Sequence, residues 1–175
     1  MNTREEAVKG ILDFLQSDKR SLLLTGTHQY EKHRLIMHIL KEYISDRSKV
    51  LFRANYMQNI GSFFDEHSKD FKTGIGYKLG IHTLYFDSIK KTSWNNTGME
   101  YDFAILYPLD NVLKSKQRIE ILDDLFETRT INKLFLVSWT DNLSYDYSEL
   151  KDYYDQHVVF DVLEENLEYH QRLDI

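Results

Sequence analysis

The chain has 175 residues, of which 42% are hydrophobic and 29% charged, enough to bury one core and few for two domains. It contains no cysteine, which excludes disulfides and thiol chemistry and is typical of a cytoplasmic protein. No run of 18 apolar residues occurs, and the first ten residues lack the apolar segment of a signal peptide. We therefore expect a single cytoplasmic domain over residues 1–175, without membrane association.

The formal net charge of -6 is distributed unevenly along the chain. Residues 1–90 carry a net charge of +3, whereas residues 91–175 carry -9. The basic amino-terminal half could contact nucleic acid, and the acidic half should repel it. The alternative is that the acidic residues simply form a solvated surface.

The first elements alternate between helix and strand. Thr3 and Glu6 fit a capping box, and the apolar spacing that follows predicts a helix over 3–16. Ser21–Thr25 is a short apolar run that predicts a strand buried on both faces. The patterns that follow predict a helix over 30–44, a strand over Val50–Ala54, a helix over 57–67 and a glycine-containing loop or hairpin over 68–80.

The second half continues in the same way. The patterns predict strands over Ile81–Phe86, Phe103–Tyr107, Lys133–Ser138 and Val158–Val162, and helices over 114–128, 147–154 and 163–173. Unbroken apolar strands separated by helices favour an α/β fold, a three-layer α/β/α sandwich with a mostly parallel sheet.

One segment matches a nucleotide-binding motif in part. Gly26 and Lys32 occupy the first Gly and the Lys of G-x-x-x-x-G-K-[ST], between the first strand and the next helix. The chain resembles the P-loop NTPases, in particular the AAA+ type of bacterial helicase loaders. The resemblance places Phe103–Tyr107 at the Walker B strand, Lys133–Ser138 at the strand that ends in a polar sensor, and 154–160 at the last core strand. It also implies that Ser21–Thr25 lies between the Walker B and sensor strands.

The departures from this family concern the nucleotide and its metal. Glu31 replaces the second loop glycine, and a carboxylate there would repel phosphate. His33 replaces the Ser or Thr that holds Mg²⁺, and imidazole suits Mg²⁺ poorly. Tyr107 and Pro108 stand where the Walker B Asp and catalytic Glu belong. Asp110 could compensate only if the end of the strand were bulged.

These losses predict no ATPase activity and no catalytic residues, because phosphoryl transfer depends on metal and electrostatics for nearly all its rate. The candidate cofactor-binding residues are Gly26, Lys32 and His33, a degenerate phosphate loop. We expect no required cofactor, and at most weak binding of ATP or another anion at Lys32. The alternative for Lys32 is a solvent-facing lysine on the first helical turn.

Other residues point to partners more than to chemistry. No histidine pair stands at i,i+4 on a helix with an acid nearby, so we expect no metal site. Tyrosines gather in the acidic segment 141–155, and Tyr145, Tyr147 and Tyr153 are candidate anchors for a protein partner, or else half-buried core residues. Six basic residues could contact nucleic acid: Lys19, Arg20, Lys32, Arg34, Lys49 and Arg53.

Together these observations favour a non-hydrolysing P-loop-like protein. It would act as an adaptor, inhibitor or regulatory subunit for a protein partner or a second copy of itself, in a system that could handle DNA. The alternative is an active ATP-binding subunit, helicase-loader-like or DNA-associated, whose missing carboxylates come from elsewhere. A third interpretation is a nucleic-acid binder that uses the basic residues.

Overall fold

A computed structural model describes residues 2–139, 147–162 and 165 of the chain. The α-helices are α1 (Arg4–Gln16), α2 (Lys32–Tyr43), α3 (Ile60–Phe63), α4 (Leu109–Lys114) and α5 (Arg118–Asp123). The strands are β1 (Ser21–Thr25), β2 (Lys49–Ala54), β3 (Tyr77–Leu79), β4 (His82–Ser88), β5 (Glu100–Leu106), β6 (Thr130–Val137) and β7 (Gln156–Val159). Short 3₁₀ or π-helical segments complete the list: η1 (Met57–Asn59), η2 (Lys91–Asn96), η3 (Asp124–Thr128) and η4 (Ser148–Tyr153).

The seven strands form one sheet in the order β3-β4-β2-β5-β6-β1-β7. Every neighbouring pair is parallel except β3 and β4, which form an antiparallel hairpin at one edge. In the centre, Leu23 of β1 is in register with Leu136 of β6 and with His157 of β7. The predicted α/β class and mostly parallel sheet are confirmed.

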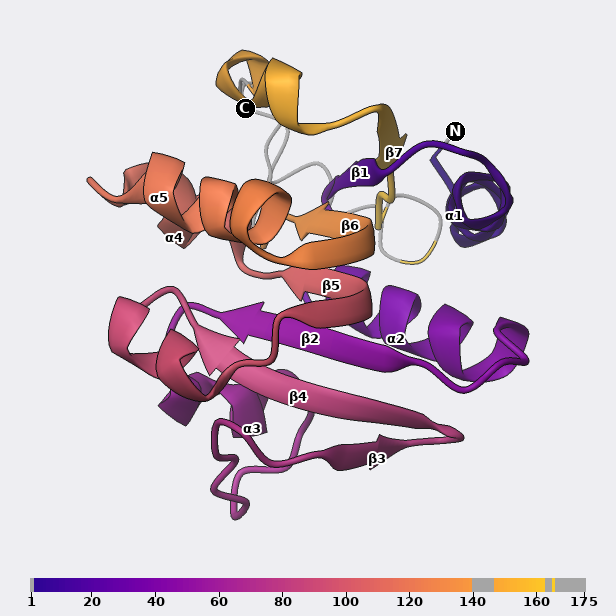
Figure 1. Cartoon of the computed structure of the whole chain (residues 1–175). Helices are drawn as coiled ribbons and strands as arrows, with labels where there is room; N and C mark the ends of the chain where they lie inside the picture. Colours follow the sequence, from indigo (N-terminus) through magenta and orange to yellow (C-terminus); the bar gives the residue numbers. More distant parts are fainter. Residues whose placement is uncertain (1, 140–146, 163–164, 166–175) are drawn as a thin grey trace.

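Helices cover both faces of this sheet (Figure 1). The side of α1 and α2 is filled by alternate strand residues such as Leu22, Phe52 and Phe135. The other side packs residues such as Leu23, Leu51 and Leu136 against α4, α5 and Leu150 of η4. Because side chains alternate across a strand, both faces of the central strands are buried, which explains their unbroken apolar sequences.

The first helix begins as predicted. The Thr3 side chain accepts a hydrogen bond from the Glu6 amide at 3.1 Å and caps α1. Several other segments are shorter or more divided than predicted. The helix expected over 57–67 is η1 followed by α3, and the helix expected over 114–128 is α5 followed by the π-turn η3. The segment 147–154 contains the 3₁₀ helix η4, and the helix predicted over 163–173 lies outside the described residues.

The expected position of the first strand was wrong. β1 lies between β6 and β7, whereas β5 lies between β2 and β6. The strand at the proposed sensor position therefore separates β1 from the strand at the Walker B position. An apolar run shows that both faces of a strand are buried, but its sequence does not specify which strand lies beside it.

A network of buried, oppositely charged side chains links the sheet to η3. The Arg53 guanidinium of β2 is fully buried and donates two hydrogen bonds of 2.8 Å to the Asp87 carboxylate of β4. It also donates to Asp124 at 2.7 Å, and Asp124 accepts from Arg129 at 2.9 Å. Although burial alone would lower it, these two carboxylates raise the pKa of Arg53. The network connects β2 and β4 with η3.

Among the helices within the described ranges, none has the length and apolar character needed to cross a membrane.

Candidate functional site

The segment Gly26–His33, which connects β1 to α2, will be called the loop. Gly26 has φ of +123°, a conformation that favours glycine. A Cβ atom on Gly26 would lie 2.1 Å from the carbonyl oxygen of Phe160, so the chain leaving β7 passes directly against the loop. Gly26 is therefore required by local backbone geometry, whether or not a phosphate binds there.

The first amides of the loop already have partners. Asp161 accepts hydrogen bonds through Oδ1 from the Thr27 amide at 2.9 Å and from the Thr27 hydroxyl at 3.3 Å. The His28 amide donates to the Phe160 carbonyl at 3.2 Å, and the Val162 amide donates to the Thr27 hydroxyl at 3.0 Å. This part of the loop thus holds a carboxylate of its own chain, because Asp161 supplies the negative charge that backbone N–H groups attract.

Lys32 is fully buried, so the solvent-facing alternative for this side chain was wrong. Its ammonium donates to the carbonyl oxygen of Gly26 at 2.5 Å and to that of Trp139 at 3.1 Å. Trp139 lies two residues after the end of β6, and Gly26 directly follows β1. Lys32 therefore connects the start of α2 to the ends of both strands. A buried ammonium needs such acceptors, because burying it unpaired would destabilise the fold by roughly several kcal/mol.

His33 lies in the first turn of α2 and is 2% exposed. Its Nε2 lies 2.7 Å from the carbonyl oxygen of Phe63, which also accepts from Arg34 Nε at 3.1 Å. Burial lowers the pKa of His33 to about 4, and the nearby charges of Arg34 and Lys32 act in the same direction. The ring is therefore neutral at physiological pH. Since a carbonyl only accepts, the proton is on Nε2 and Nδ1 carries a lone pair.

Tyr107 follows the last residue of β5 and stacks on His33, with ring centroids 4.1 Å apart and planes at 20°. It is 2% exposed, and burial raises the pKa of its phenol, so the hydroxyl stays protonated. Asp110 does not take the place of the carboxylate that is missing at Tyr107. It lies in the first turn of α4, where Oδ1 accepts the Trp139 amide at 2.8 Å. Its carboxylate thus holds the end of β6.

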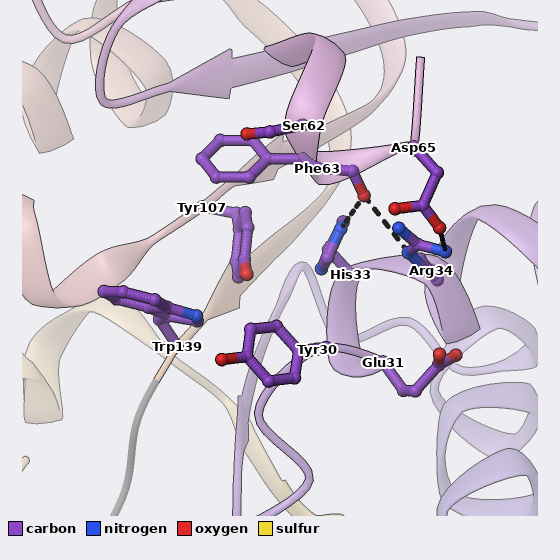
Figure 2. A pocket seen from close by; sticks show the side chains of 9 residues that line it. All are labelled: Tyr30, Glu31, His33, Arg34, Ser62, Phe63, Asp65, Tyr107 and Trp139. Atoms are coloured by element: carbon purple, nitrogen blue, oxygen red, sulfur yellow. Dashed lines mark hydrogen bonds and ion pairs between the residues drawn. The ribbon is translucent and has the colours of Figure 1, made fainter. Parts of the chain in front are cut away.

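A pocket of about 360 Å³ opens beside this stack (Figure 2). It lies at the carboxyl edge of the parallel strands, where α/β proteins usually bind ligands. Its lining combines the loop and α2 with α3 and the ends of β5 and β6, and consists of Tyr30, Glu31, His33, Arg34, Ser62, Phe63, Asp65, Tyr107 and Trp139. Tyr30 is 63% exposed and Trp139 38% exposed, so aromatic rings form the mouth.

Mg²⁺ and a triphosphate do not fit these residues. The two positions that the family resemblance assigns to metal ligands hold a neutral imidazole and a neutral phenol in van der Waals contact. Mg²⁺ prefers charged or carbonyl oxygens in octahedral geometry. Glu31 is the N-cap residue of α2, so the start of this helix carries a negative charge that would repel a phosphate. Of the three predicted residues, the structure brings Gly26 and Lys32 together, while His33 points into the aromatic pocket.

Two of the three candidate tyrosine anchors lie within the described residues, and both are partly buried. Tyr147 and Tyr153 are half-buried against the hydrophobic cluster on the α5 side of the sheet. The Tyr153 hydroxyl donates to Asp123 at 3.1 Å, and its ring meets Phe126 edge-on at 5.3 Å between centroids. Tyr145 lies outside the described residues. Their role in partner binding stays a hypothesis.

Two of the six basic residues proposed for nucleic acid are unavailable. Lys32 and Arg53 are fully buried, so neither can reach a phosphate backbone. Arg34, at the carboxyl edge of the sheet, is paired with Asp65 at 2.8 Å. The remaining three are Lys19, Arg20 and Lys49, which flank the amino ends of β1 and β2. The set therefore does not form one patch.

Several residues of the site escaped prediction, among them Phe63, Trp139 and Asp161. Phe63 and Trp139 carry no motif, and their position depends on how α3 and β6 end near α2. Asp161 contacts Thr27 across 134 residues of sequence. The only sequence signal was that an acid follows the apolar run of the last strand, where a parallel sheet places polar side chains at its carboxyl edge.

No protein-family model matches the chain, and a search of curated protein sequences gives no match either.

Proposed function

We propose that this chain is a non-hydrolysing protein on a P-loop-like scaffold that works by binding a protein partner, as an adaptor, inhibitor or regulatory subunit. The observation that carries the proposal is the stack of His33 on Tyr107. It fills, with two neutral rings, the place where a P-loop enzyme needs oxygen ligands for Mg²⁺. Without that metal the scaffold keeps shape and surface as its means of action.

The loop supports the same proposal. Asp161 and Phe160 accept hydrogen bonds from the amides of Thr27 and His28, and Lys32 donates to Gly26 and Trp139. A triphosphate would have to displace contacts that the chain already makes with itself. Each such exchange costs the hydrogen bond it breaks, about 1 kcal/mol net and more for the charged groups.

The pocket favours binding over catalysis. Its walls are largely aromatic, and two of its three charged side chains, Arg34 and Asp65, form an ion pair at 2.8 Å, while the third is Glu31. Exposed rings at the mouth of a pocket are typical of protein-binding surfaces, where Tyr and Trp carry much of the affinity.

Calorimetry with ATP and Mg²⁺ tests the proposal. We expect a dissociation constant weaker than about 100 μM, equivalent to less than about 5.5 kcal/mol of binding free energy. Glu31→Gly should tighten binding of ATP without Mg²⁺ if the loop keeps a cradle shape, and Glu31→Gln is the control that removes only the charge. Low-micromolar binding that depends on Mg²⁺ would overturn the proposal and favour an active ATP-binding subunit.

A further inference from the structure

We draw no further inference here: the strongest candidate, the pocket of about 570 Å³ that Arg47 and Lys78 form with the β3–β4 hairpin beside His82, carries nothing, because the His82 Nε2 atom is buried beyond the reach of a ligand and nothing within the described residues shows what the two exposed basic side chains would bind.

Discussion

The rings of His33 and Tyr107 lie face to face, 4.1 Å between centroids and 20° between planes, although 74 residues separate them in sequence. The first belongs to the opening turn of α2, the second to the end of β5. Phe52, Phe63 and Phe64 approach the His33 ring edge-on. An imidazole enclosed in this way is kept neutral, since its charged form would lose hydration without gaining a counter-ion.

The stability of the fold should therefore depend on pH through His33. Burial lowers its pKa to about 4 from 6.5. Below pH 6.5 His33 is protonated in the unfolded chain but stays neutral in the folded chain. Its contribution to the free energy of unfolding is therefore complete above about pH 6.5 and is lost as pH falls toward 4. Urea unfolding should show a loss of about 2 kcal/mol between pH 7 and 5. His33→Phe, measured in parallel, should reduce that loss, and an identical pH dependence in both proteins would contradict the assignment.

Gly26→Ala should destabilise the fold by more than about 3 kcal/mol. Its φ of +123° disfavours any side chain, and the new Cβ would lie 2.1 Å from the Phe160 oxygen. Gly74→Ala is the matched control: φ is +77° there, but the nearest atom, Asn96 Cβ, is 3.2 Å away, so about 1 kcal/mol is expected. Thermal melts of the two variants would contradict the argument if their losses were similar.

Much of the fold followed from sequence because the central strands bury both faces. Ser21–Thr25 was placed correctly, and β2, β5 and β6 were placed within three residues at either end. The elements that were misjudged are weakly patterned. The helix around α3 ends early because Phe63 and Phe64 turn inward to pack on His33, a tertiary contact that overrides helical spacing.

The site was only partly predictable. Gly26 and Lys32 follow a motif, so their positions were found from spacing alone. Whether Lys32 reaches solvent or folds back depends on carbonyl groups of Gly26 and Trp139, the latter 107 residues away. Pairings over such distances are set by strand order, and the strand order is the feature that the apolar pattern left open.

Arg53→Met should cost about 3–5 kcal/mol, because it leaves Asp87 buried without its bidentate partner. Asp124 would keep Arg129, so the loss falls mainly on the junction of β2 with β4. Arg118→Met is the control. Its side chain is 43% exposed and its Nε lies 4.0 Å from the Glu149 carboxylate, so its loss should change stability by no more than about 0.5 kcal/mol. Equal effects in urea unfolding would show that the buried network adds nothing.

Tyr153 decides between the two interpretations of the carboxyl-terminal tyrosines. If the ring is structural, Tyr153→Ala should lower stability by about 2 kcal/mol, because it removes packing on Phe126 and the bond to Asp123. Tyr153→Phe keeps the packing and loses only the hydroxyl, so about 1 kcal/mol or less is expected. Tyr43→Ala, at a ring that is 56% exposed, should leave the melting temperature nearly unchanged. A Tyr153→Ala protein that melts like wild type would show that this ring is free to move, and its role as a partner anchor would gain over the structural one.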